Sequence, residues 1–321
     1  GWGHTTYFDG YMAEYNFIDG QQLDPTHFGY TESQTELWRP KRYEGTYGTN
    51  GFHLEFKDNS STSALGKDTS GNGNDFTTNN FSVATGSADN IYNNDSVIDT
   101  PSDRYATLNA LHGYSYNTTF ANGNLFANIP ASNTYGRAFG NIPIKSGKWY
   151  WEVYYNQAGG NGNYLYVGLQ SPDGQTFYRA VRGSDGEQYP NTGATAVRFA
   201  TGDIINVAVD LDAGKWYIGR NGTYWYSGNP VAGTGFVHSD LISANARTPI
   251  DGLVPLFYNA TSGATQQFSV NFGQKPFIYT PPTGYKTINS KNLPIHSPSV
   301  LRPQRHFGTL LYTGNGSNGN A

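Results

Sequence analysis

Residues 147–155 read GKWYWEVYY, and large apolar side chains recur there at every second position. Successive side chains of an extended strand point to opposite faces of a sheet, so one face of this segment collects four large residues. They are Trp149, Trp151, Val153 and Tyr155. The same period of two returns at 164–169 and 203–211, whereas a sustained period of 3.6 occurs nowhere. The pattern predicts antiparallel β-strands.

Turn residues separate these strands. Asp212-Ala213-Gly214 follows the strand at 203–211, and Asn221-Gly222 follows the next one. Asn-Gly supplies the two positive φ angles that a two-residue type I′ hairpin turn requires. We expect the remaining strands at 215–218, 223–226, 253–258 and 267–272.

The composition agrees with an all-β chain. Of the 321 residues, 15% are aromatic and only 14% are charged, against about 25% charged in an average soluble domain. Aromatic residues and the 40 glycines favour pleated strands joined by tight turns over helices. The net charge of -4 gives no electrostatic reason to bind nucleic acid. No apolar run reaches the ~20 residues of a membrane helix, and the absence of cysteine excludes disulfides.

Composition also predicts three parts. Residues 58–100 are rich in Asn, Ser, Thr, Gly and Asp, which is typical of long surface loops. We therefore expect a partial β module over 1–103 and one β-sandwich over 104–288. An extended connector is expected over 289–321, with a strand-like stretch at 309–312 and a start of a further module at its end.

The segment 68–75 spaces oxygen-bearing side chains as the first half of a calcium loop does. The candidate ligands are Asp68, Ser70, Asn72 and Asp75. The twelfth position of such a loop holds a bidentate Glu, whereas this chain has Asn79 there. A solvated turn is the favoured interpretation, with Ca²⁺ as the alternative, and no other cofactor is expected.

Two pairs of carboxylates are spaced closely enough for comparison with the glycosidases, which use two carboxyl groups. Asp210 and Asp212 lie at a strand end, where turn chemistry explains them. Asp185 and Glu187 lie in a mixed-charge loop that also contains Arg182. Spacing without a cleft does not make a mechanism, so we expect no enzyme. The seven histidines show no zinc-binding spacing.

Aromatic residues beside predicted loops are the stronger binding candidates. Tyr and Trp bury much area with little loss of rotamer entropy and keep a polar edge, which suits sugars and protein partners. The candidate ligand-binding residues are Tyr178, Arg182, Tyr189, Trp225, Tyr226 and Tyr258. The alternative is that half or more of the aromatic residues pack in the core or in a subunit interface.

The segment from about Asn124 to Tyr285 resembles a SPRY (B30.2-like) domain. Five ordered motifs carry this resemblance: SGKWYWEV at 146–153, YVGL at 166–169, TGDIINVAVD at 201–210, GRNG at 219–222 and VNFGQKPF at 270–277. The resemblance implies a two-sheet sandwich that serves as a binding scaffold, with loops that differ in their partner from member to member.

Two flanking stretches resemble a laminin-G or concanavalin-like jelly roll. YFDGYMAEYNFIDG at 7–20 looks like a closing strand of that family, and 68–75 looks like its opening turn. This order of modules, with LYTGNG at 311–316, is similar to long structural proteins of tailed bacteriophages. It implies a parent polypeptide that extends beyond both ends.

These observations together give a first hypothesis and two alternatives. The first is a non-enzymatic virion component at the particle surface, such as a tail fibre or tail tip. Its partners would be other virion subunits, further copies of itself, and a host-surface glycan or protein, without membrane insertion. The alternatives are a purely structural spacer or capsid or tail decoration, and a polysaccharide depolymerase that uses Asp185 and Glu187.

Overall fold

The computed structural model describes twelve stretches of the chain: residues 12–31, 38–83, 95–99, 104–113, 115, 117–131, 136–158, 164–174, 178–189, 198–241, 252–259 and 263–293. The chain divides into two compact units. One unit comprises Gly1–Gln21 and Thr46–Leu293, and the other comprises Gln22–Gly45 and Pro294–Ala321.

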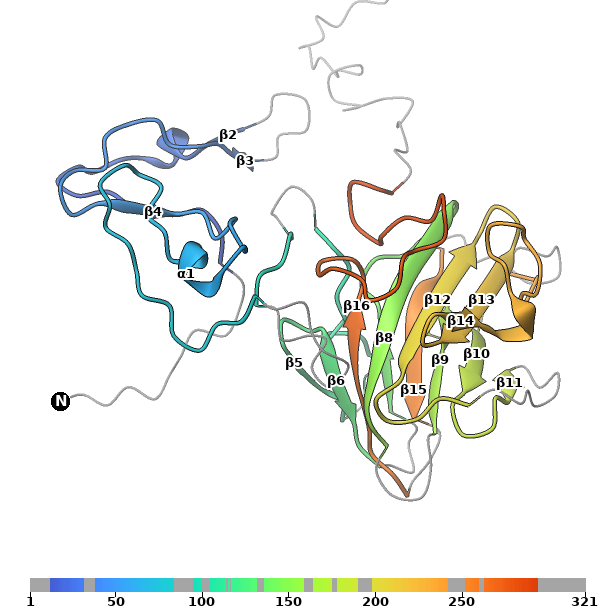
Figure 1. The fold of residues 1–321 in the computed structure, drawn as a ribbon. Helices are drawn as coiled ribbons and strands as arrows, with labels where there is room; N and C mark the ends of the chain where they lie inside the picture. The colour runs from blue at the N-terminus through green and yellow to red at the C-terminus, as the bar shows by residue number, and fades with distance from the viewer. Residues whose placement is uncertain are drawn as a thin grey trace, which may run out of the picture. The chain divides into compact units, whose positions relative to one another are not determined.

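Two antiparallel sheets form the larger part of the first unit (Figure 1). The seven-stranded sheet has the order β14-β13-β12-β8-β16-β6-β5. Its strands are β5 (Thr119–Ala121), β6 (Phe126–Ile129), β8 (Lys148–Ala158), β12 (Ile204–Asp210), β13 (Lys215–Arg220), β14 (Thr223–Tyr224) and β16 (Gln266–Asn271). The strand predicted around 147–155 is β8, and it lies near the centre between β12 and β16.

The second sheet has five strands in the order β11-β10-β9-β15-β7. Its strands are β7 (Arg137–Phe139), β9 (Leu165–Gln170), β10 (Tyr178–Arg182), β11 (Gln188–Tyr189) and β15 (Val254–Asn259). All pairings in both sheets are antiparallel. The antiparallel all-β class predicted from the sequence is therefore confirmed.

One apolar core lies between the sheets, and the predicted alternation supplies it. The four residues expected on one face of β8 are all at most 1% exposed. The matching faces of β9 and β12 join them in the same cluster, with Leu165, Val167, Leu169, Ile205, Val207 and Val209. Burial of this apolar area from both sheets is the main stabilising contribution of a sandwich.

The hairpin predicted at Asn221-Gly222 is also confirmed. Asn221 has φ 51° and Gly222 has φ 82°, and the turn joins β13 to β14. Asn221 Oδ1 accepts a hydrogen bond from Ile204 N–H at 2.9 Å, which ties the turn to the start of β12. The return strand is short, because a 3-10 turn, η2 (Trp225–Ser227), begins after Tyr224.

The outer face of the seven-stranded sheet is covered by the chain itself. Residues 275–287, here called the strap, cross this face and carry Phe277 and Tyr285 onto Tyr150 and Tyr217. Glu152 of β8 is fully buried beneath the strap. Its carboxylate accepts hydrogen bonds from Ile278 N–H at 2.9 Å and Tyr279 N–H at 2.8 Å.

The N-terminal part of the first unit contains little regular structure. β1 (Tyr15–Phe17) pairs with β4 (Phe52–Leu54), and α1 (Thr62–Leu65) precedes the turn at 68–75. The sequence predicted loops over 58–100; the described residues between 58 and 83 have no strand, but the short helix α1 lies among them. In the second unit, η1 (Pro25–His27) leads into a hairpin of β2 (Gly29–Thr31) and β3 (Trp38–Pro40).

The domain boundaries at 103 and 288 stay predictions. The strand-like stretch at 309–312 lies outside the described residues. Within the part of the chain that the structure describes, no helix has the length and apolarity that crossing a membrane requires.

Candidate binding site

Strand register brings four side chains into one row on the outer face of the five-stranded sheet. Arg182 of β10 pairs with Tyr166 of β9, Tyr166 pairs with Tyr258 of β15, and Tyr258 pairs with Arg137 of β7. The two tyrosine rings lie 5.4 Å apart between their centroids. The Arg182 guanidinium lies 5.6 Å from the Tyr166 ring, and that of Arg137 lies 5.2 Å from the Tyr258 ring. We call these four residues the tyrosine row.

Cation–π contacts at both ends hold the two rings in place. Burial raises the pKa of Tyr166, so its hydroxyl stays protonated and donates to Glu187 Oε2 at 3.0 Å. Tyr258 is partly buried, while Tyr166 is 6% exposed. The row is therefore a rigid support that presents only part of its surface.

Arg182 organises the loop at one end of the row. Its guanidinium bonds the Asp185 carboxylate through Nε at 2.9 Å and reaches Glu187 Oε2 at 2.6 Å. The hydrogen bond from Arg182 lowers the pKa of Asp185, which keeps that group ionised. Two carboxylates thus share one cation, and the loop 183–187 has a fixed shape.

Two exposed tyrosines lie where the edges of the two sheets meet. Tyr189 of β11 is 46% exposed and Tyr226 of η2 is 50% exposed. Gln188 Nε2 donates to Tyr226 Oη at 2.7 Å, so β11 of one sheet is joined to η2 of the other. We call Tyr189 and Tyr226 the edge tyrosines.

The exposed Tyr226 has a left-handed backbone conformation. Its φ is 54°, and Ser227 after it has φ 53°. Bulky residues in this left-handed region are uncommon, and such strain is often found at ligand-contacting sites. Trp225, by contrast, is buried: it is 6% exposed, and its ring is stacked on that of Phe199 with 6.3 Å between the ring centroids. The ring expected to contact a ligand therefore packs in the core beneath the edge.

The five predicted residues whose side chains the structure describes fall into three groups. Arg182 and Tyr258 belong to the tyrosine row, and Tyr189 and Tyr226 form the edge pair. Trp225 is internal, which agrees with the alternative that many aromatics pack in the core. Tyr178 lies at the start of β10, and its side chain is outside the described part of the structure.

Sequence reasoning missed three residues of this site. Tyr166 and Arg137 complete the row, and Gln188 joins the two sheet edges. Alternation did signal Tyr166, because it lies between Leu165 and Val167 and must face away from the core. No local signal marks Arg137 or Gln188.

The depolymerase residues lie in the same loop. A glycosidase needs one carboxyl group that is protonated and can act as a general acid. Asp185 and Glu187 both bind Arg182, and the pKa of Asp185 is lowered rather than raised. This geometry supports a structural role for the pair.

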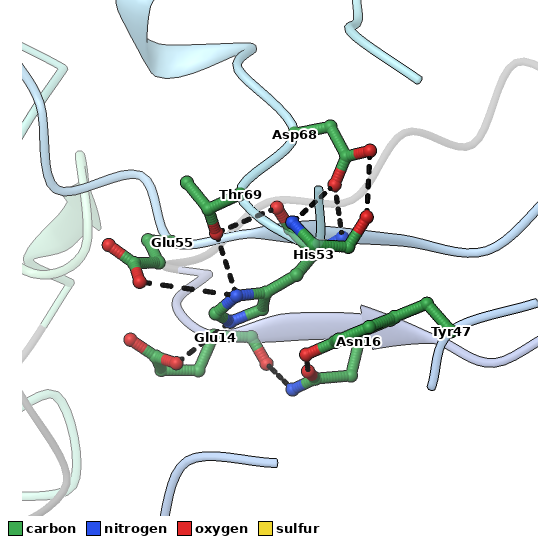
Figure 2. A network of polar contacts seen from close by, with 8 residues as sticks. Glu14, Asn16, Tyr47, His53, Glu55, Asp68 and Thr69 are labelled. Atoms are coloured by element: carbon green, nitrogen blue, oxygen red, sulfur yellow. Dashed lines mark hydrogen bonds and ion pairs between the residues drawn. The ribbon is translucent and has the colours of Figure 1, made fainter. Parts of the chain in front are cut away.

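The turn at 68–75 holds itself together through the oxygens proposed as calcium ligands. Asp68 accepts a hydrogen bond from His53 N–H at 2.9 Å (Figure 2). It also accepts hydrogen bonds from Ser70 N–H at 2.8 Å and Asn74 N–H at 2.9 Å. Burial opposes ionisation of Asp68, but these donors outweigh it and lower its pKa to about 2. Asp75 pairs with Lys67.

The amide of Asn72 is engaged as well, because its Nδ2 donates to Gly51 O at 2.8 Å. These contacts give the solvated-turn interpretation a physical basis, while calcium stays a prediction. Among the described residues, no group of three or more His, Cys, Asp or Glu side chains is arranged to hold a metal ion.

The sheets and the site together define an antiparallel β-sandwich with an aromatic edge. No protein-family model matches this chain. No curated protein sequence matches it either. Among solved structures, the chain is similar to the SPRY domain of human HERC1, with 17% sequence identity and a TM-score of 0.38. That similarity covers 50% of this chain and 94% of the other. The fold class rests on the two sheets described above.

Proposed function

We propose that this chain is a non-enzymatic virion component, such as a tail fibre or tail tip, whose sandwich binds a host-surface glycan or protein. The edge tyrosines are the observation that carries the binding part of this proposal. They are large, exposed and held in place, Tyr226 by its hydrogen bond with Gln188 and Tyr189 by its place in β11. Stacking of a sugar ring on such a tyrosine buries apolar area while the hydroxyl stays available for hydrogen bonds.

The location at a virion surface is supported by the order of modules alone. The SPRY-like segment at 124–285 follows a stretch similar to laminin-G domains, as in bacteriophage structural proteins. Low charge and Asn/Gly-rich loops suit a chain that contacts other subunits, including copies of itself.

A purely structural role is the second candidate, and one observation favours it. The N-terminal part of the first unit carries several exposed aromatic side chains, among them Tyr15, Phe17 and Phe76 at 44–47%. The Phe17 and Phe52 rings are stacked at 5.3 Å, and Phe76 meets Phe52 edge-on at 4.7 Å. Such aromatic groups are typical of interfaces between subunits.

The test is binding of the full chain to host cells and to a printed array of bacterial surface polysaccharides. Tyr189→Ala and Tyr226→Ala should each weaken binding about 10-fold, which corresponds to about 1.4 kcal/mol per contact ring. Tyr30→Ala is the matched control, because Tyr30 is 51% exposed but lies in the other unit, on β2.

Equal binding by wild type and by both edge variants would show that the edge tyrosines do not contact the ligand. Absence of binding to every cell and polysaccharide would favour the structural role. Release of shortened sugar chains during the assay, lost in Glu187→Gln, would favour the depolymerase.

A further inference from the structure

A hydroxyl, an imidazole and a carboxylate form a continuous hydrogen-bonded line in the N-terminal part of the first unit (Figure 2). Thr69 Oγ1 lies 2.8 Å from His53 Nδ1, and His53 Nε2 lies 2.9 Å from Glu14 Oε2. The three groups come from the turn at 68–75, from β4 and from the residue before β1. A nucleophile next to a base, with the base oriented by a third group, is the arrangement that activates a hydroxyl.

The partners of the imidazole fix its tautomer. An ionised carboxylate only accepts hydrogen bonds, so the proton of a neutral His53 lies on Nε2 and points to Glu14. Nδ1 then carries the lone pair and can accept the Thr69 O–H, which also lies within hydrogen-bond distance of the His53 backbone carbonyl oxygen at 3.3 Å. The hydroxyl therefore lies within reach of a base that is free to take its proton.

A second carboxylate, that of Glu55, also faces the imidazole. Glu55 Oε1 lies 4.0 Å from His53 Nδ1, on the side that would receive the proton (Figure 2). Glu14 remains bound to Nε2, so an imidazolium would lie between two carboxylates. The His53 side chain is 2% exposed and its ring is stacked on Tyr47 at 5.9 Å, which limits screening by water.

The residue that carries the hydroxyl lies at the surface, although the base is buried. Thr69 is an exposed residue, and the next glycines, Gly71 and Gly73, have open space where a side chain would project. Glu14, which orients the imidazole, has a left-handed backbone with φ 52°. A non-glycine residue held in this region is strained, and such strain gathers at functional sites.

We propose that Thr69 is an acyl-acceptor site whose hydroxyl is activated by His53 and Glu14. The substrate class is an activated ester. Thr69 Oγ1 attacks the carbonyl carbon and forms a new ester bond, while its proton passes to His53 Nδ1. The bond from that carbon to the leaving oxygen breaks, and the proton on Nδ1 returns to the leaving alkoxide. The products are O-acyl-Thr69 and one alcohol.

The test uses the full chain and p-nitrophenyl acetate, with peptide mass spectrometry to locate the acetyl group. We expect one acetyl group per chain at Thr69, formed ~100-fold faster than at Thr77, because a positioned general base contributes at least that factor. Thr77 is the internal control, an exposed threonine on the same stretch of chain that makes no contact with a histidine among the described residues.

Variants distinguish activation of the Thr69 hydroxyl from a purely structural role of this hydrogen-bonded group. Thr69→Val should abolish acetylation at this position, and Thr69→Ser should retain it. Glu14→Gln removes a charge from a side chain that is 54% exposed, so the fold should persist. Acetylation of this variant should be at least ~10-fold slower while its unfolding midpoint stays within error of wild type.

Three outcomes would overturn the proposal. They are acetylation at Thr69 no faster than at Thr77, acetylation confined to lysine side chains, and an unchanged rate in Glu14→Gln with the fold intact. None of these outcomes depends on the function proposed for the edge tyrosines.

Discussion

Aromatic residues lie on both outer faces of the sandwich. The strap crosses one of these faces, that of the seven-stranded sheet. On the seven-stranded sheet, Tyr150 and Tyr217 are closed off by the strap, and Glu152 anchors that cover from below. On the five-stranded sheet, guanidinium groups flank the tyrosine row, and the exposed Tyr189 lies at the edge of the sheet in register with Ala180. The buried Glu152 carboxylate fixes the strap on its own chain, whereas Arg182 on the other face binds the two carboxylates of its own loop.

The largest effect is expected from removal of Glu152, which anchors the strap. Glu152→Ala leaves Ile278 N–H, Tyr279 N–H and the Tyr150 hydroxyl without their acceptor. Each unsatisfied buried donor costs about 1–3 kcal/mol, so we expect a loss of about 3–5 kcal/mol in the free energy of unfolding. Urea denaturation measures it, and hydrogen exchange at 276–280 should rise. Glu187→Ala is the control on the other face, and a loss below 1 kcal/mol in Glu152→Ala would contradict the anchoring role.

Arg182→Lys, on the outer face of the five-stranded sheet, should have a smaller effect. A lysine cannot bind Asp185 and Glu187 through the planar fork that an arginine offers. We expect a loss of about 1 kcal/mol, and faster proteolysis within 183–187. The control is Arg220→Lys, since Arg220 is exposed and its closest contact with Asp203 is 3.7 Å. Equal effects of both variants would show that the fork contributes nothing.

The smallest expected effects are pH dependences of opposite sign. Burial raises the pKa of Glu152, so its contribution to stability is full below its ordinary value near 4.5 and is lost as the pH rises through the raised pKa. The bond from Arg182 lowers the pKa of Asp185, so its contribution is present above 3.8 and is lost as the pH falls.

Thermal unfolding of Glu152→Gln and Asp185→Asn, each compared with wild type between pH 3 and 7, measures these two slopes. The difference in stability between wild type and Asp185→Asn should increase in favour of wild type as the pH rises. The difference between wild type and Glu152→Gln should change in the other direction. Slopes of the same sign would mean that the pKa values of Glu152 and Asp185 are shifted in the same direction, which would contradict the prediction.

Local alternation predicted the core well and the outer faces poorly. It placed Trp149 and Trp151 inward correctly, because the inward face of a strand is a property of the strand itself. It gave no sign that Glu152 would be fully buried, since the groups that cover it lie more than 120 residues later, at 278–279. A contact between such distant segments leaves no periodic trace.

The site shows the same limit. Arg182 and Tyr258 were predicted one by one, but their joining through Tyr166 depends on the register of four strands. Trp225 and Tyr226 are neighbours with similar chemistry, and the left-handed backbone at Tyr226 sends one ring outward while the other stays inside. Asp68 was found by its spacing, yet backbone donors from β4 and the turn occupy its oxygens.

The strands at the borders of the sheets are short, and this has a consequence for assembly. β11 and β14 have two residues each, and β5 and β7 have three each. A short border strand offers few unpaired N–H and C=O groups to a strand from another molecule. These four border strands are therefore poor templates for the addition of a strand from another copy of the chain.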